Sequence, residues 1–277
     1  MANKHQELNK TFYILIDEAQ FTRDILGSGI TQIGRANYGQ RGMYFQAFTG
    51  ISTGLERIGK LCLLLDYYIQ HNGTFPDDKY LKNEIGHDLI KIYEKSKLII
   101  DRNEIEFSFQ NGVIDPIQIE ILKILSKFAK GDRYSNIDFL VNSKYQSDPI
   151  RNWHEKIDKE LYKKRVSKQK KEKIEFNAKI IGKLLDPVSS VRHYSESREE
   201  INNMESASFL TGMMESIAKY RQLYILQIVR YWVEVIRSLQ SKARKLGYND
   251  IPWFTEVFAI FNNKDSYFLT RKTYETD

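Results

Sequence analysis

Two histidines and two arginines in this chain have side chains whose chemistry suits the breaking of a phosphodiester bond. His87 lies in the segment NEIGHDLIKIY and Arg133 in the segment KGDRYSNIDFL. Imidazole titrates near neutral pH and can move protons, while a guanidinium binds phosphate oxygens in a bidentate fashion. We therefore consider His87 as an acid–base group and Arg133 as a phosphate clamp, with Tyr134 as a stacking platform for a base. The alternatives are a solvated histidine and a loop arginine paired with Asp132 or Asp138.

Arg151 and His154 form a second pair of this kind in the segment DPIRNWHEK. The preceding Asp148 and Pro149 are typical of a helix N-terminus, so both side chains are expected on the first turns of a helix. A cation and a proton shuttle three residues apart can share one phosphodiester. A solvated helix start explains the same pattern equally well.

A run of positive charge follows directly. Between Lys156 and Lys173 the chain carries nine lysines and arginines against three acids. Such a run is usually a solvated helix face. Otherwise it attracts a nucleic-acid backbone, with an affinity that falls steeply as salt is added. The residues considered as backbone contacts are Lys163, Lys164, Arg165, Lys168, Lys170 and Lys171.

The composition argues against several other kinds of site. Cys62 is the single cysteine, which rules out an internal disulfide and a cysteine-rich zinc site. The five histidines are scattered without metal-ligand spacing, so we expect no metal and no other cofactor. The first ten residues contain no apolar run, and the longest apolar tract, at 61–65, is far shorter than a membrane span. We expect a cytoplasmic protein without a membrane partner, whose net charge of +6 permits binding to nucleic acid.

The clearest helix of the sequence precedes His87. Its apolar stripe, at alternating spacings of three and four, consists of Phe48, Ile51, Leu55, Ile58, Cys62, Leu65 and Ile69. Opposite the stripe, Glu56 and Lys60 form either a solvated ion pair or the rim of a site. Gly50 and Gly54 share one flank, where the missing side chains let another backbone approach. We expect this helix to be central in the fold or to pack against a second subunit.

Helical spacing also predicts the elements on either side of this helix. A first helix ends near Gly27, and the glycine-rich segment 27–42 is expected to be a loop and a weak phosphate-binding candidate. A third helix is predicted over 81–92, with His87 pointing away from its apolar stripe. Segment 105–109 alternates briefly and is interpreted as a short strand or a loop.

The second half of the chain is expected to contain longer helices. A fourth helix runs over 116–130 behind an Asp115 cap, and a charged helix runs from 149 to about 185. Ser197 and Glu200 form a capping box for a last long helix that ends near Gly247. The tail adds a short helix and an extended segment. The expected whole is a single all-α domain over 1–277.

Three segments, in this order, resemble HEPN-domain proteins: YFQAFTGISTGLERIGKL, EIGHDLIKIYEKS and KGDRYSNIDFLV. The resemblance covers residues 40–142 and implies an up-and-down helical bundle that forms a homodimer. The long helical regions at 148–186 and 197–277 are then additions to that bundle. Many HEPN proteins are metal-independent ribonucleases of toxin–antitoxin, abortive-infection and CRISPR systems, and others bind nucleotides or proteins without catalysis. The nuclease branch carries an arginine and a histidine with four to six residues between them, whereas Asp138 stands at that distance from Arg133.

Two functions are therefore expected. The first is a metal-independent endoribonuclease or toxin of antiviral defence, in which Arg133 or Arg151 holds phosphate and His87 or His154 assists attack by a 2′-hydroxyl. The second is a non-catalytic HEPN-like protein that recruits RNA, a nucleotide or a partner protein of a defence or toxin–antitoxin system.

Overall fold

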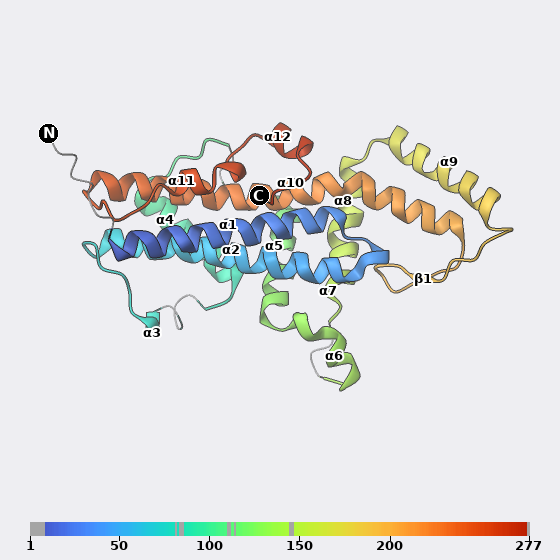
Figure 1. The fold of residues 1–277 in the computed structure, drawn as a ribbon, viewed down its shortest axis with the longest axis horizontal. Coiled ribbons are helices and arrows are strands. Elements are labelled where there is room, and N and C mark those ends of the chain that lie inside the picture. The colour runs from blue at the N-terminus through green and yellow to red at the C-terminus, as the bar shows by residue number, and fades with distance from the viewer. Residues whose placement is uncertain are drawn as a thin grey trace.

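The computed structural model describes residues 9–80, 82, 86–109, 112–113, 115–143 and 147–275. This part of the chain is mostly helical and contains only two two-residue strands, which confirms the predicted all-α fold class. Three long helices, α1 (Lys10–Arg35), α2 (Arg41–Gln70) and α10 (Met204–Lys245), lie side by side along the longest axis (Figure 1). Because α10 has 42 residues, it is about 63 Å long and reaches from one end of the bundle to beyond the other.

α2 is a central helix of the fold, which is one of the two positions predicted for it; the other was packing against a second subunit. Its predicted apolar stripe is buried throughout. The glycine flank faces α1 of the same chain, because a Cβ added at Gly54 would lie 2.4 Å from Leu26 Cγ and one at Gly50 would lie 3.0 Å from Ile25 O. The two glycines therefore mark a close helix contact within the chain and give no sign of a second subunit.

The expected loop at 27–42 is largely wrong, because α1 continues to Arg35. A Cβ added at Gly27 would lie 2.1 Å from Tyr274 O, and one at Gly29 would lie 2.8 Å from Ile51 N. Glycine lowers helix stability by about 1 kcal/mol relative to alanine. Here it lets α2 and the C-terminal segment pack directly on the α1 backbone, so packing overrides the local preference. The turn into α2 is short and contains the 3₁₀ turn η1 (Tyr38–Gln40).

In the described residues, α2 is followed by α3 (Asp78–Tyr80), α4 (Leu89–Asn103), α5 (Pro116–Lys130) and α6 (Ser135–Leu140). Asp115 caps α5 as predicted and forms a capping box with Gln118. The helix predicted over 81–92 has its N-cap at Asp88, whose side chain accepts from the N–H groups of Ile90 and Lys91. Residues 81 and 83–85 of that prediction lie outside the described part. Segment 105–109 forms a loop, one of its two expected states.

The charged region expected as one helix from 149 to 185 is divided. It consists of α7 (Pro149–Trp153), a π-helical turn η4 (His154–Asp158), α8 (Lys159–Arg165) and α9 (Lys168–Leu185). Val166 is buried and extended, and Ser167 starts a new helix by accepting from the N–H of Lys170. The chain changes direction between α8 and α9, and α9 then packs along α10 (Figure 1).

The capping box predicted at Ser197 and Glu200 is also wrong. Ser197 lies in the connection of a short hairpin, and Glu200 lies in its second strand. The hairpin pairs β1 (His193–Tyr194) with β2 (Glu200–Ile201), and Asn203 caps α10 instead. After α10, the chain forms α11 (Phe254–Val257), the 3₁₀ turn η5 (Ala259–Phe261) and α12 (Asp265–Thr270), and then extends across α1. None of the helices in the described part has the length and apolarity that crossing a bilayer requires.

Candidate nucleic-acid interface

His87 lies in the turn before α4, rather than on a helix as predicted. Its side chain is 75% exposed, and Nδ1 lies 2.9 Å from Glu56 Oε1. The same carboxylate oxygen accepts from Lys60 Nζ at 2.7 Å, so the predicted Glu56–Lys60 pair exists and His87 joins it. A carboxylate on one ring nitrogen orients an imidazole and leaves the other nitrogen free to exchange a proton.

Arg133 lies in η3 (Asp132–Tyr134), directly after α5. Its guanidinium donates to the carbonyl of Ala129 and pairs with neither acid considered for it. Asp132 instead accepts from Ser147 Oγ at 2.8 Å and lies 3.8 Å from Lys127 Nζ. Tyr134 is 60% exposed and open to stacking. Arg133 thus caps the C-terminal end of the preceding helix α5, and this bond uses part of the hydrogen-bonding capacity of its guanidinium.

The turn with His87 and the end of α5 lie against each other. Asp88 accepts from Ser126 Oγ at 2.9 Å and from Lys130 Nζ, both on α5. The structure thus links the His87 turn to the helix end that Arg133 follows. The lysines there, Lys60 and Lys130, are each neutralised by a carboxylate, so they offer less to a phosphate than free cations do.

Arg151 and His154 do not share a surface. Arg151 is exposed on α7, whereas His154 is 3% exposed and lies 3.5 Å, Nδ1 to Oδ2, from the buried Asp158. The two are on the same helical run, but only one side of that run faces solvent. His154 therefore cannot reach a phosphate held by Arg151 at the surface.

A buried ion pair that the sequence did not reveal lies beside His154. Arg221 donates to both oxygens of Asp158, at 2.7 and 2.6 Å, and both residues are fully buried. Its remaining N–H groups donate to the carbonyls of Ile33 and Ala36 at the end of α1 and to Tyr44 Oη. Burial alone would lower the pKa of Arg221, but the Asp158 carboxylate raises it, so the guanidinium stays charged. All five donors are used within the core, so this cluster joins elements and offers nothing to a ligand.

Most of the lysines expected to contact a nucleic-acid backbone have local partners. Lys164 lies 3.3 Å from Glu160, and Lys168 lies 3.7 Å from Glu172, each one helical turn away. Lys171 donates to the Lys163 carbonyl at 3.1 Å, and its Nζ lies 5.2 Å from the centroid of the Tyr162 ring. Arg165 and Lys170 are different, because both line cavities beside α10.

Three cavities beside α10 share lining residues, and we call them together the α10 groove. Their volumes are about 680, 390 and 500 Å³, and Glu215 lines all three. The cations that line them are Arg35, Arg165, Lys170, Lys219, Arg271 and Lys272, and Glu215 is the one acid among their lining residues in the described part of the chain. None of these six cations is within ion-pair distance of a carboxylate in that part of the chain. The groove therefore combines free positive charge with a concave surface.

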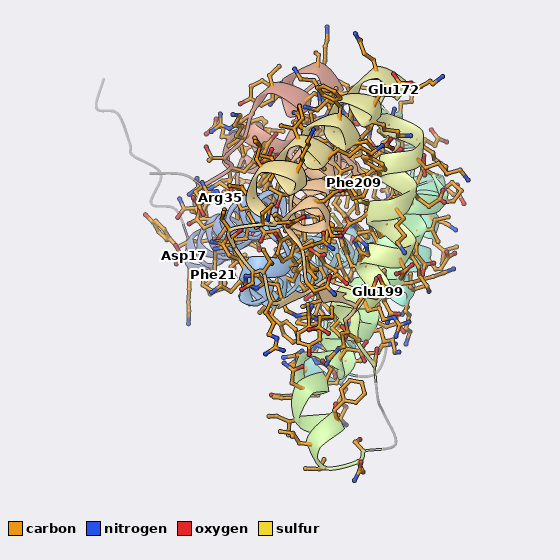
Figure 2. All side chains as sticks on the ribbon, turned by 90° about the vertical axis from the view of Figure 1, so that its right-hand side faces the viewer. Asp17, Phe21, Arg35, Glu172, Glu199 and Phe209 are labelled. Atoms are coloured by element: carbon orange, nitrogen blue, oxygen red, sulfur yellow. The ribbon has the colours of Figure 1, made fainter. Side chains whose placement is uncertain are left out.

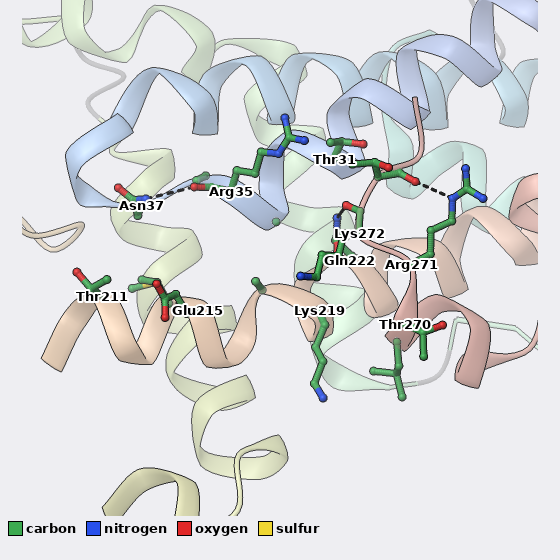
Figure 3. A pocket seen from close by; sticks show the side chains of 16 residues that line it. Thr31, Arg35, Asn37, Thr211, Glu215, Lys219, Gln222, Thr270, Arg271 and Lys272 are labelled. Carbon is green, nitrogen blue, oxygen red and sulfur yellow. Dashed lines mark hydrogen bonds between the residues drawn. The ribbon is translucent and has the colours of Figure 1, made fainter. Parts of the chain in front are cut away.

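The C-terminal segment forms one wall of the first cavity (Figure 3). Gln222 Nε2 donates to the carbonyls of Ile30 and Lys272, at 3.1 and 3.0 Å, and so joins α10, α1 and this segment. The N–H of Tyr274 donates to Thr31 Oγ1 at 2.8 Å, and the Tyr274 side chain is fully buried. These contacts place Arg271 and Lys272 opposite the end of α1 across the cavity.

The third cavity places aromatic rings beside the cations. Arg165 Nε donates to Tyr224 Oη at 3.2 Å, and its guanidinium lies 5.2 Å from the centroid of that ring. Tyr220 lines this cavity, and Lys219 Nζ lies 5.0 Å from its centroid. Cations and aromatic faces at this range attract each other. The cations of this cavity can bind the phosphates of a nucleic acid, and the Tyr220 ring can stack on one of its bases.

The sequence pointed to two of the six groove cations and missed four. Arg165 and Lys170 belong to the charged run, whereas Arg35, Lys219, Arg271 and Lys272 come from three other segments. No local signal marks them, because the groove is assembled from elements that are distant in sequence. Within the described residues, no group of three or more His, Cys, Asp or Glu is arranged to hold a metal ion.

Comparisons with known proteins add no name to this site. No family model matches the sequence, and no curated protein and no solved structure matches it either.

Proposed function

We propose that this protein binds RNA along the α10 groove and acts as a HEPN-like binding protein. The observation that supports the proposal is an imbalance of charge. Among the residues that the structure describes, six cations without a carboxylate partner and one acid line the three adjoining cavities. Each cation that neutralises a phosphate releases condensed counterions, which favours binding. The His87 surface offers no comparable imbalance, because its lysines are ion-paired.

The arrangement of the cations favours an extended chain over a single small anion. In Figure 3, Arg35 and Arg271 point to one side of the first cavity while Lys219 points to the other. A compact phosphate site has donors that converge on one point. Here the donors are spread along the groove, as a polymer of regularly spaced phosphates requires.

Two features support RNA as the polymer. The resemblance of residues 40–142 to HEPN-domain proteins, many of which act on RNA, indicates this class of ligand. The half-buried Tyr220 in the groove supplies a sequence-tolerant stacking surface for an unpaired base. The proposal places the protein in the cytoplasm.

The test is binding of a fluorescein-labelled oligouridylate, followed by fluorescence anisotropy as a function of salt. We expect the variant with Lys170→Gln, Lys219→Gln and Lys272→Gln to bind at least about tenfold more weakly at moderate salt. The slope of log K against log salt should fall by about 2, because each single-strand phosphate contact contributes about 0.7.

A matched variant controls for net charge. Lys82, Lys97 and Lys123 are also exposed, and each is paired with an acid outside the groove. The triple glutamine variant at these positions has the same net charge as the groove variant and should bind nearly as well as the native protein. Equal losses in both variants would show that net charge alone attracts RNA, and no binding by the native protein would refute the proposed function.

A second candidate function is metal-independent RNA cleavage. The observation that favours it is the exposed imidazole of His87, oriented by Glu56 at 2.9 Å. This arrangement can supply a general base for a 2′-hydroxyl. Arg133 or Arg151 would be the phosphate-binding group, and His154 would have no part because it is buried.

A further inference from the structure

The inner side of α9 is already packed against α10. Ile174, Ala178 and Gly182 are buried along this contact. A Cβ added at Gly182 would lie 2.7 Å from Glu205 Cβ, and one at Gly212 would lie 2.9 Å from Ile174 Cγ2. The two helices therefore approach closely, and α9 has a fixed inner and a fixed outer side.

The outer side carries large apolar side chains in solvent, and we call it the α9 outer face. Phe176 is 62% exposed, Ile180 41% and Leu184 64%, at successive spacings of four residues. Val188, in the turn after the helix, is 80% exposed as well. Burial of one such side chain is worth about 1.5–3 kcal/mol. Three large apolar side chains exposed in one row on a helix indicate an interaction surface, whereas single exposed apolar residues do not.

Positive charge flanks this row. At 100° per residue, Lys173, Lys179 and Lys183 lie within about 60° of Phe176 around the helix. Glu172 also lies in this arc, and its carboxylate is 3.7 Å from Lys168 Nζ. α9 as a whole has six lysines and two glutamates. Figure 2 looks onto the end of the molecule where α9 lies, with Glu172 near the start of the helix at the periphery. The face therefore carries an apolar row with three lysines and one glutamate around it, and its net charge is positive.

We propose that the α9 outer face docks an acidic amphipathic helix of a protein partner. A row at i, i+4 and i+8 forms a ridge that fits the groove between side chains on another helix. Glutamate or aspartate beside the apolar stripe of that helix would meet Lys173, Lys179 and Lys183. A second copy of this chain is disfavoured at this face, because a symmetric contact would bring the lysines of two α9 helices together.

The test uses a synthetic amphipathic peptide of about 20 residues with a leucine stripe flanked by glutamates. We expect saturable binding by fluorescence anisotropy, and at least about tenfold weaker binding to the Leu184→Asp variant. A peptide with lysine in place of each glutamate should bind at least about tenfold more weakly than the acidic one. Leu98→Asp on α4 is the matched control, because Leu98 is a 61% exposed leucine on another helix, and it should bind as the native protein does.

Leu184 is exposed, so the aspartate variant should fold, and its circular dichroism and its oligouridylate binding should stay unchanged. Three results would overturn the proposal: equal binding of the acidic and basic peptides, no effect of Leu184→Asp, or no peptide binding at all. A dimer of the native protein in sedimentation experiments that Leu184→Asp dissolves would assign the face to a second copy. Binding to phosphatidylcholine–phosphatidylserine vesicles without peptide binding would assign it to a membrane surface.

Discussion

At the scale of single residues, His87 and His154 lie in different environments, although the same proton-transfer role was predicted for both. His87 is exposed and bonded to Glu56, while His154 is buried beside Asp158. A side chain can exchange a proton with a bound ligand only if the ligand can reach it from solvent. His87 therefore stays a candidate for chemistry and His154 becomes part of the core.

His87 makes the cleavage function testable. If the protein cleaves RNA in the presence of EDTA, His87→Ala should lower the rate at least about 100-fold, because general acid–base groups contribute at this level. His71→Ala is the matched control, since His71 is also exposed and its Nδ1 is bonded to the Tyr67 carbonyl. The measurement is the loss of full-length RNA on a denaturing gel. Cleavage that persists in the His87 variant, or no cleavage by the native protein, would rule this mechanism out.

At the scale of elements, single polar residues decide where helices begin. Asp88 starts α4 and Ser167 starts α9, and both interrupt helices that apolar spacing had predicted to continue. Apolar spacing indicates which face of a helix is buried. The start of the helix is set instead by the residue whose side chain accepts hydrogen bonds from the first N–H groups. Conversely, Gly27 and Gly29 did not end α1, because the C-terminal segment and α2 pack on them and stabilise the helix.

The start of α4 should be sensitive to acid. Burial alone would raise the pKa of Asp88, but hydrogen bonds from Lys130, Ser126 and the backbone of Lys91 lower it below its ordinary value. A lowered pKa in the folded state stabilises the protein above the pKa of the unfolded chain, and this stabilisation is lost as pH falls through the folded value. We expect Asp88→Asn to lower the free energy of unfolding by about 1 kcal/mol at neutral pH.

The difference between native protein and Asp88→Asn should begin to shrink below about pH 4, where the carboxyl of the unfolded chain takes up a proton, and should vanish as the pH falls through the lower pKa of the folded state. Urea unfolding at neutral and acid pH measures it. Asp78→Asn removes an exposed carboxylate from a surface ion pair with Lys82 and should change stability little at either pH. A difference for Asp88→Asn that is constant with pH would contradict the assignment.

At the scale of the whole molecule, the Arg221–Asp158 pair joins parts that are far apart in sequence. Arg221 on α10 contacts the end of α1, Tyr44 on α2 and Asp158 in the π-helical turn. Burial and the nearby Glu196 and Asp158 raise the pKa of Tyr44 against the opposing effect of Arg221, so this residue stays a neutral phenol that donates to Glu196. The cluster thereby sets the position of α1, α2 and α10 around one point.

Breaking this pair should be strongly destabilising. Arg221→Met leaves Asp158 charged and unpaired in the core, and Asp158→Leu does the same to Arg221, so each is expected to lower the free energy of unfolding by about 3–5 kcal/mol. The double variant should lose clearly less than the two single losses together, because it leaves no buried charge unpaired. Urea unfolding of the three variants provides the measurement. Single losses below about 1 kcal/mol, or strictly additive losses, would show that the pair does not hold the helices together.

The sequence by itself determined the fold class, the buried stripe of α2 and the cap of α5, because periodic burial and capping depend on residues that are near in the chain. It also placed Arg165 and Lys170 in a positively charged run. Only the tertiary structure decided that α1 runs through its glycines, that His154 is buried, and that Arg221 meets Asp158. The α10 groove belongs to this second group. Its cations come from four distant segments, and their proximity depends on long-range packing that no local pattern encodes.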